Sequence, residues 1–306
     1  MFDLTALAEA LTARGRIARV VIAAHDGSSP REVGAAMLIW AEGQSGTIGG
    51  GALEFEAAGQ ARALLAVGGR VVARVALGPS LGQCCGGAVT LWSEVHDAVP
   101  VPEAGVIACG PGEMPLAVRR ILTAARGQGT LPEPGLVQGW LVEPVAQVER
   151  QVWVWGAGHV GRALVSVLAP LPGIAVTWVD VGSERFPDAV PEGVTVVPAA
   201  DPALLADHAP EGAEHLILTY SHALDLELCH RLLNRGFRSC GLIGSATKWA
   251  RFRSRLKALG HAAAEVGRIS CPIGDPGFGK HPQAIAVGVV AELLRAPRVA
   301  AREMRA

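Results

Sequence analysis

The stretch "VWVWGAGHVGRALVSVL", residues 152–168, decides the fold of this 306-residue chain. A short apolar run is followed there by the pattern G-x-G-x-x-G at Gly156, Gly158 and Gly161. The first glycine permits a tight turn, the second lets phosphates approach the backbone, and the third allows close packing of the helix. Asp180 stands 24 positions after Gly156, near the spacing of an acid that binds a ribose hydroxyl. The pattern predicts a Rossmann unit.

Three further strand-like runs follow this motif, at residues 194–197, 215–220 and 239–244, with helical segments between them. This alternation predicts a Rossmann-like, doubly wound parallel sheet over residues 150–306, with a C-terminal helix. Polar residues follow the strands, and folds of this kind bind ligands at the carboxyl edge of the sheet. We therefore expect a nucleotide or anion crevice formed by Gly156, Gly158, His159, Gly161, Asp180, His222, Ser245 and Lys248.

Structural roles compete for several of these residues. His222 and Asp225 have the three-residue spacing of a capping interaction at a helix start, which suits them better than catalysis. Ser245 can equally cap a helix, and Lys248 lies near enough to the same helix start to meet an anion.

Upstream, the consecutive glycines Gly49, Gly50 and Gly51 lead into a helical segment with an apolar face. The first N–H groups of a helix lack backbone partners and lie at the positive end of its dipole, so such a loop can bind an anion. Glu54, in the first turn, can instead complement that dipole itself. Arg31 lies in an earlier turn, where it can pair bidentately with a phosphate or a carboxylate.

The stretch "GQCCGG", residues 82–87, places Cys84 and Cys85 between glycines. Neighbouring Cα atoms are about 3.8 Å apart, whereas disulfides usually need about 4.4 Å or more, so we expect two thiols. On an extended chain they point to opposite sides, so at most one faces a given site. Gly82, Gly86 and Gly87 carry no side chain, so a ligand can approach the sulfur and the backbone N–H groups, and Gln83 adds an amide for a polar ligand. A tight loop of packed small residues is the competing interpretation.

Composition excludes several classes of function. With 18% charged residues and a net charge of −1, the chain has no field that would attract nucleic acid or anionic lipid. We identify no export signal and no apolar run long enough for a bilayer, and the six cysteines show no repeating pattern, so we expect a cytoplasmic protein. We predict a mixed α/β domain at residues 1–100, a joint at 101–149 and the Rossmann-like domain at 150–306.

The chain resembles the XdhC/CoxI-type accessory proteins of molybdenum hydroxylases such as xanthine dehydrogenase. The stretches that carry the resemblance, in family order, are "GSSPREVGAAMLI", "GTIGGGALEFEA", "LGQCCGG", "GAGHVGRAL", "SHALDLEL", "GLIGSATKWARF" and "PIGDPGFGKHPQAIAVGVVAELL". They extend from Gly27 to Leu294. Two positions depart from the family pattern: Gly182, where arginine is often found, and Tyr220, where the side chain is often smaller.

The resemblance implies a chaperone and maturation factor, not a turnover enzyme. Such a protein would hold molybdenum cofactor (molybdopterin), present it to a cysteine desulfurase that exchanges a molybdenum oxygen for sulfur, and deliver it to an apo-hydroxylase such as xanthine dehydrogenase. Thiolate is a soft ligand for the metal, and backbone amides suit the cofactor's phosphate. We therefore expect Cys85 as a transient molybdenum ligand within a cofactor site of Arg31, Gly49, Gly50, Gly51, Gln83, Cys84 and Gly86. The family also implies a homodimer.

Two other classes of function remain open. An NAD(P)-dependent oxidoreductase would use the Rossmann unit for its nicotinamide cofactor, but this leaves the cysteine loop without a role. A zinc-binding scaffold has less support, because the chain has no C-x-x-C pair and its histidines stand apart.

Overall fold

The computed structural model describes residues 1–78 and 86–295. The chain divides into two compact units, Met1–Ala146 and Gln147–Ala306. Within residues 101–149, which we predicted as a joint, one helix and three strands belong to the first unit, which ends at Ala146. In the part of the chain that the structure describes, no helix is both long enough and apolar enough to span a membrane.

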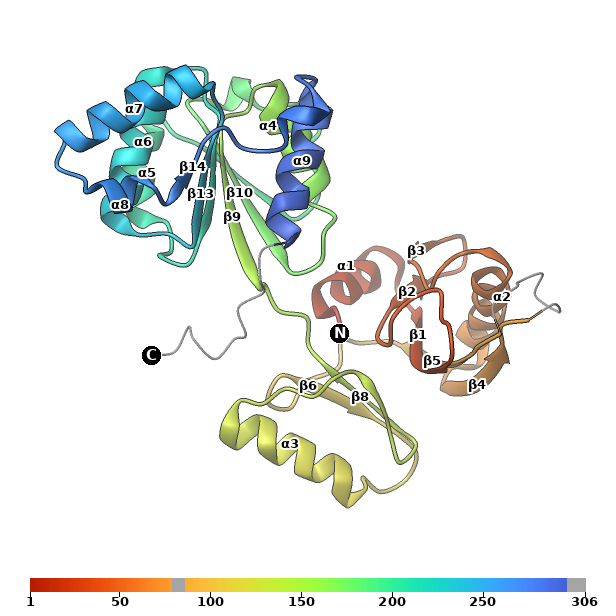
Figure 1. Cartoon of the computed structure of the whole chain (residues 1–306). Coiled ribbons are helices and arrows are strands. Elements are labelled where there is room, and N and C mark those ends of the chain that lie inside the picture. Colours follow the sequence, from red (N-terminus) through yellow and green to blue (C-terminus); the bar gives the residue numbers. More distant parts are fainter. Residues whose placement is uncertain (79–85, 296–306) are drawn as a thin grey trace. The chain divides into compact units, whose positions relative to one another are not determined.

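The first unit contains a five-stranded antiparallel sheet with the order β3-β2-β1-β5-β4. Its strands are β1 (Ile17–Asp26), β2 (Ala36–Ile39), β3 (Gln44–Gly46), β4 (Arg70–Ala76) and β5 (Ala88–His96). Helix α2 (Gly51–Val67) packs on one face of this sheet, as Figure 1 shows. Its buried face contains Leu53, Ala57, Ala61 and Leu64, the apolar positions that recur at helical spacing in the sequence.

A second, three-stranded sheet of this unit has the order β6-β8-β7, with β6 (Val106–Cys109), β7 (Gly135–Val137) and β8 (Trp140–Pro144). Helix α3 (Leu116–Gln128) packs on it through Val118 and Leu122, and α1 (Leu4–Arg14) precedes β1. Strand β1 is buried on both faces because alternate residues contact α2 and the three-stranded sheet.

A buried ion pair joins the two sheets of the first unit. Arg19 of β1 donates to both carboxylate oxygens of Glu143 of β8, at 2.6 and 2.8 Å, and both side chains are buried. The Arg19 guanidinium also lies 4.2 Å from the centre of the Phe2 ring. Paired in this bidentate way, the two charges are tolerated inside the unit.

The second unit is built on a six-stranded parallel sheet with the order β11-β10-β9-β12-β13-β14. The strands are β9 (Arg150–Trp155), β10 (Ile174–Asp180), β11 (Val194–Pro198), β12 (Glu214–Ile217), β13 (Ser239–Leu242) and β14 (Ile269–Ser270). Counted along the chain, this is the 3-2-1-4-5-6 order of dinucleotide-binding Rossmann folds. The predicted doubly wound parallel sheet is confirmed.

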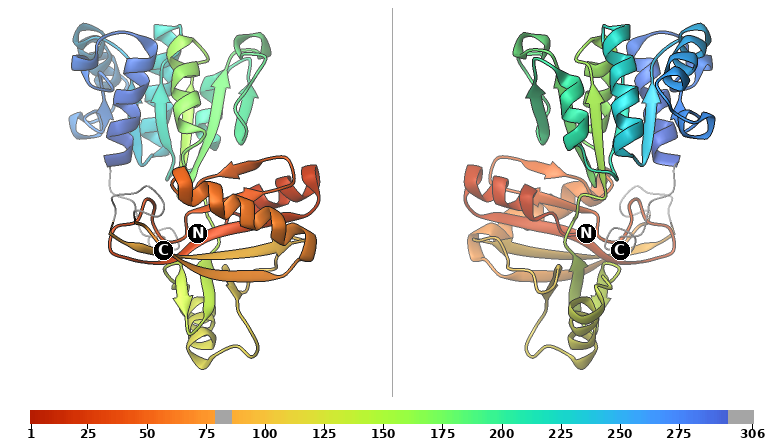
Figure 2. Two further views of the ribbon diagram at one scale, coloured as in Figure 1. Left: turned by 90° about the vertical axis from the view of Figure 1, so that its right-hand side faces the viewer. Right: turned by 90° about the vertical axis from the view of Figure 1, so that its left-hand side faces the viewer.

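Helices cover both faces of the parallel sheet (Figures 1 and 2). Helices α4 (His159–Leu168) and α9 (Pro282–Arg295) pack together on one face. The other face carries α5 (Pro202–Leu205), α6 (His222–Arg235), α7 (Ala246–Ala258) and α8 (Ala263–Val266). The chain reverses its winding direction between β9 and β12, which is where folds of this kind bind ligands.

Candidate functional site

Three loops meet at one end of the five-stranded sheet. Strands β1, β3 and β4 end there and β2 and β5 begin there, so the connections after Asp26, Gly46 and Ala76 lie at the same end. A Cβ atom built on Gly49 would lie 2.5 Å from the Cβ of Pro30, and one built on Gly87 would lie 2.1 Å from the backbone oxygen of Ser28. The loop after β1 is therefore packed against both glycine loops.

The cysteine loop enters this end of the sheet through its described flanks. Gly86 is exposed, and a Cβ atom on it would have no neighbour within 4 Å. Gln83, Cys84 and Cys85 lie outside the described residues, so their predicted roles as cofactor ligands stay predictions.

The carboxylate of Glu54 occupies the start of α2. Its Oε2 accepts hydrogen bonds from the N–H groups of Ile48 and Gly50, each at 3.0 Å, and from the Thr47 hydroxyl at 2.5 Å. Its Oε1 accepts from Gln44 Nε2 at 3.0 Å. Burial raises the pKa of Glu54, but these hydrogen bonds outweigh burial and hold the pKa below its ordinary value.

This arrangement corrects the expectation that the amides of the three glycines are all free. The N–H of Gly50 donates to Glu54, and the N–H of Gly49 donates to the Thr47 hydroxyl at 3.0 Å. All three glycines have positive φ angles, of 123°, 75° and 65° from Gly49 to Gly51, so side chains would strain this loop. The alternative, in which Glu54 complements the helix itself, describes the loop correctly.

Arg31 also has a partner within the chain. Its guanidinium donates to both oxygens of Glu32, at 3.0 and 2.9 Å, and lowers the pKa of that carboxyl to about 2, the side-chain hydrogen bond being the main cause. The Arg31 side chain remains 40% exposed. It can therefore still contact an anion, although in competition with Glu32.

In the second unit, Gly156 and Gly161 of the motif have the close backbone packing that the pattern predicted. A Cβ atom on Gly156 would lie 2.5 Å from the backbone oxygen of Leu218, and one on Gly161 would lie 2.0 Å from that of Gly156. Both positions therefore need glycine for close packing. A Cβ atom on Gly158 would meet nothing within 4 Å, so the space in front of this residue is open.

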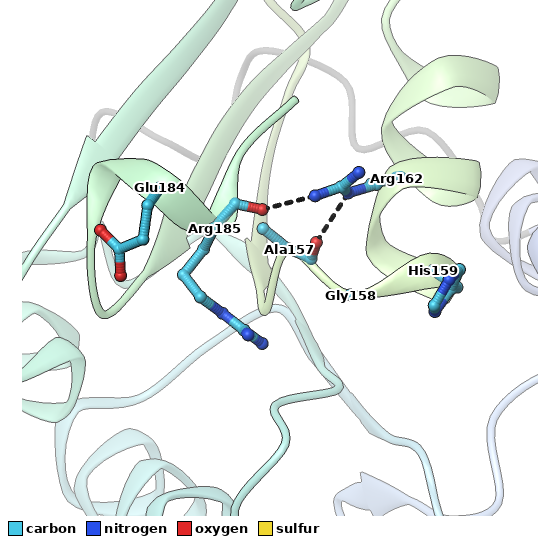
Figure 3. Close-up of a pocket in the computed structure, with 6 residues that line it drawn as sticks. All are labelled: Ala157, Gly158, His159, Arg162, Glu184 and Arg185. Carbon is cyan, nitrogen blue, oxygen red and sulfur yellow. Dashed lines mark hydrogen bonds between the residues drawn. The ribbon is translucent and has the colours of Figure 1, made fainter. Parts of the chain in front are cut away.

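A cavity of about 250 Å³ lies beside this glycine loop, at the carboxyl end of β9. Figure 3 shows its lining residues: Ala157, Gly158, His159, Arg162, Glu184 and Arg185. Arg162 of α4 donates to the backbone oxygens of Ala157, at 3.0 Å, and of Arg185, at 2.8 Å. These bonds hold the 3₁₀ turn η2 (Ser183–Arg185) against the glycine loop.

Asp180 lies at the carboxyl end of β10, as predicted, but its carboxylate is buried under the glycine loop. Its Oδ2 accepts from the Ala157 N–H at 2.6 Å and its Oδ1 from the Val181 N–H at 2.7 Å. The Nε of Arg185 lies 3.6 Å from that Oδ1, and within the described residues this buried nitrogen has no hydrogen-bond partner. Asp180 thus supports the loop and does not line the cavity.

The other predicted crevice residues lie at the ends of β12 and β13. Ser221, not the pair of His222 and Asp225, caps α6, so the predicted capping interaction is wrong. Ser245 caps α7, which confirms the structural alternative for that residue. Lys248 donates to Asp225 at 2.6 Å and is nearly buried, so its charge is matched within the chain.

Sequence reasoning missed two arginines of the cavity. Arg162 directly follows the third glycine of the motif and could have been found from its position in the first turn of the helix. Arg185 follows Asp180 by five residues in a 3₁₀ turn, for which the hydrophobic pattern gives no signal.

Metal-binding potential is limited in residues 1–78 and 86–295, where no group of three or more histidine, cysteine, aspartate or glutamate side chains could hold an ion. The cysteines of these segments, Cys109, Cys229, Cys240 and Cys271, are free thiols. Burial is the main cause that raises their pKa, in Cys109 to about 12, so they stay protonated at neutral pH.

Known proteins similar to this chain include a curated protein and a solved structure. A curated relative from Escherichia coli K12, uncharacterized protein YqeB, is 28% identical over 141 residues, which are 46% of this chain and 26% of the relative. The chain thus matches about a quarter of the length of that relative. A crystal structure from Bacillus halodurans, described as a xanthine dehydrogenase, superposes with a TM-score of 0.67 at 18% identity, covering 96% of this chain and 95% of that one. At this identity the likeness shows the fold.

Family profiles match both units. The profile of the XdhC and CoxI family matches residues 10–76, which include the triple-glycine loop and the loop after β1. The profile of the XdhC Rossmann domain matches residues 152–293, which include the cavity and the sheet around it. The chain belongs to the XdhC and CoxI family.

Proposed function

We propose that this protein is an accessory factor of a molybdenum hydroxylase such as xanthine dehydrogenase, which holds molybdenum cofactor for sulfuration and delivers it to the apo-enzyme. Family membership supports an accessory role. The observation that carries the proposal is that the loops after β1, β3 and β4 meet at one end of the five-stranded sheet. One of these loops contains the adjacent cysteines of the sequence.

The chemistry of this loop cluster suits a cargo that is anionic and has affinity for sulfur. We assign Cys85 as the transient soft donor to the molybdenum of the cargo, with Gly86 leaving its flank uncovered. The phosphate of the cargo needs hydrogen-bond donors, and we assign this role to the 40% exposed Arg31 side chain and to the exposed Gly51 beside the Glu54 carboxylate. A transient thiolate bond fits a protein that must release its cargo to a cysteine desulfurase and then to a client enzyme.

Retention of the cofactor through gel filtration tests this assignment. The full chain and its Cys85→Ala and Cys109→Ala variants are incubated with molybdenum cofactor, and molybdenum and pterin fluorescence are measured in the protein peak. We expect Cys85→Ala to lose retention and Cys109→Ala, whose thiol is half-buried and protonated, to keep it. Equal retention by both variants would remove Cys85 from the site, and no retention by the unaltered protein would remove the proposed function. The elution volume also tests the expected homodimer.

An NAD(P)-dependent oxidoreductase is the second candidate, because the strand order and the open space at Gly158 favour nucleotide binding. It requires a nicotinamide dinucleotide bound one per chain and turnover of a carbonyl or hydroxyl substrate. Spectroscopic titration with NADPH and NADH, followed by a substrate screen, tests it independently of molybdenum cofactor.

A further inference from the structure

The cavity beside the glycine loop combines several features of a phosphate site. It lies in front of Gly158, where space is open, and at the first turn of α4, whose N–H groups have no partner within the helix. Its charged lining consists of the guanidinium groups of Arg162 and Arg185 and the carboxylate of Glu184. The lining therefore carries a net positive charge.

Arg185 has a hydrogen-bonding capacity that the described chain does not use. Its Nε is buried, without a hydrogen-bond partner in the described residues, and the nearest carboxylate oxygen, on Asp180, is 3.6 Å away. The Arg185 side chain as a whole is 38% exposed, so the outer nitrogens of its guanidinium can donate to a ligand oxygen. Arg162 has a different role. Its hydrogen bonds to the backbone oxygens of Ala157 and Arg185 position the turn η2, which carries the Arg185 guanidinium (Figure 3).

The size of the cavity and a contact at its edge discriminate between ligands. A volume of about 250 Å³ is below the range of roughly 300–1,000 Å³ of sites for drug-sized ligands, so the cavity suits a diphosphate group and does not enclose the two nucleosides of a dinucleotide. A dinucleotide on this fold crosses from the β10 side to the β12 side of the sheet edge. The guanidinium of Arg185, after β10, lies 5.2 Å from the ring centre of Tyr220, after β12, and this contact crosses that path.

We propose that the Rossmann unit binds a nucleoside diphosphate and not a nicotinamide dinucleotide, which argues against the oxidoreductase named above as the second candidate function. The diphosphate lies against Gly158, accepts hydrogen bonds from the first turn of α4, and meets the exposed outer nitrogens of the Arg185 guanidinium. Arg162 is a positioning residue that fixes η2. The proposed molybdenum cofactor site belongs to the first unit, and the nucleotide proposal does not rest on it.

Calorimetric titration of the full chain with ADP, NAD⁺, NADPH and inorganic pyrophosphate tests the proposal. Gly158→Val fills the open space, and the backbone there, with φ −72° and ψ −175°, accepts any side chain. Arg185→Ala removes the proposed phosphate ligand. Arg253→Ala is the control, because it removes an equal charge from an exposed position on α7 of the same unit. Circular dichroism verifies that each variant is folded.

We expect ADP to bind the unaltered protein at least as tightly as either dinucleotide. Loss of one charge-assisted hydrogen bond in Arg185→Ala should raise the Kd for ADP by about tenfold or more. Gly158→Val should abolish binding, and Arg253→Ala should leave the Kd unchanged. Tyr220→Ala opens the path across the sheet edge and should improve binding of the dinucleotides relative to ADP.

Several results would overturn the proposal. One is binding of NAD⁺ or NADPH to the unaltered protein more than about tenfold tighter than ADP, a difference of about 1.4 kcal/mol. Others are unchanged ADP affinity in Gly158→Val, or no binding of any nucleotide at about 1 mM. The titration of the unaltered protein decides the question even where a variant fails to fold.

Discussion

Replacement of Glu54 by glutamine tests whether the start of α2 is an anion site. The Glu54 carboxylate already accepts hydrogen bonds from the N–H groups of Ile48 and Gly50, the groups that a phosphate of the cofactor would use. Glu54→Gln removes the negative charge but keeps an oxygen of nearly the same size and position. If the triple-glycine loop binds the cofactor, this variant should be less stable and should bind the cofactor more tightly.

The cost in stability follows from the four hydrogen bonds that Glu54 accepts. Bonds to a charged group contribute more than neutral bonds, so we expect the free energy of unfolding to fall by about 1–2 kcal/mol. The folded pKa of Glu54 lies below its ordinary value of 4.5. Its charge therefore stabilises the fold above that value, and the contribution is lost as the pH falls through the folded pKa. The two proteins should differ most near neutral pH and converge in acid.

The gain in binding follows from charge repulsion. Two unit charges about 5 Å apart repel each other by roughly 3 kcal/mol at an effective dielectric constant of about 20, and salt reduces this value. Removal of the Glu54 charge should therefore lower the Kd for molybdenum cofactor roughly tenfold to a hundredfold. Glu56→Gln is the matched control, since Glu56 is exposed on the same helix.

Urea denaturation gives the stability and pterin fluorescence in equilibrium dialysis gives the Kd. A stability loss in Glu54→Gln with an unchanged Kd would refute the assignment of Gly49, Gly50 and Gly51 to the cofactor. If Glu54→Gln and the unaltered protein had the same free energy of unfolding between pH 6 and 8, the four hydrogen bonds would not contribute the stability that we assign to them. If the Kd fell equally in Glu56→Gln, the gain in affinity would come from the change in net charge and not from the triple-glycine loop.

Three further perturbations test other parts of the structure. Glu143→Ala leaves the Arg19 charge buried alone and should lower the free energy of unfolding, measured in urea, by about 3–5 kcal/mol. The double variant Arg19→Met with Glu143→Leu should restore most of that free energy. A loss below about 1 kcal/mol in Glu143→Ala would be inconsistent with burial of the pair. Gly87→Ala places a Cβ atom 2.1 Å from the backbone oxygen of Ser28 and should lower the melting temperature by several degrees. Gly86→Ala should leave the melting temperature unchanged, because a Cβ atom there has no neighbour within 4 Å. Equal melting temperatures of the two variants would contradict the packing of these loops. Burial lowers the pKa of His215 to about 3, below its ordinary 6.5, so the unfolded chain takes up the proton at a higher pH than the folded chain does. The free energy of unfolding should therefore fall as the pH drops from 6.5 towards 3. An equal fall in His215→Phe would show that other groups cause the pH dependence.

The Rossmann unit could be predicted because its signals are local. The glycine motif, the apolar strands and the helix between them lie within about 30 residues. Gly156 and Gly161 stand where the nearby backbone requires a residue without a side chain. The first unit offers no such signal. Its sheet depends on pairing between β1 and β5, far apart in sequence, and its two sheets are joined by Arg19 and Glu143, 124 residues apart. The sequence therefore predicts no more than a joint at residues 101–149.

Within the sites, sequence identified the loops but not the partners of their polar groups. Nothing in the spacing of Lys248 and Asp225 indicates that they pair, since 23 residues and a β-strand separate them. Arg185 is brought to the glycine loop by a 3₁₀ turn, which has no hydrophobic period. A polar side chain's partner is set by tertiary packing, so residue type and position alone leave it open.

In each of the two glycine loops, a carboxylate of the chain itself accepts hydrogen bonds from backbone N–H groups. The two carboxylates lie differently, and their positions decide how a phosphate can bind. At α2, Glu54 takes the N–H groups of both Ile48 and Gly50, so a phosphate there has to compete with a fixed negative charge. At α4, Asp180 takes the N–H of Ala157 from beneath the loop, and the space before Gly158 stays open. The loop of the Rossmann unit is therefore the more accessible phosphate site. If the triple-glycine loop binds an anionic cargo, we expect that cargo to need a second bond, such as one from sulfur to metal, to overcome the Glu54 charge.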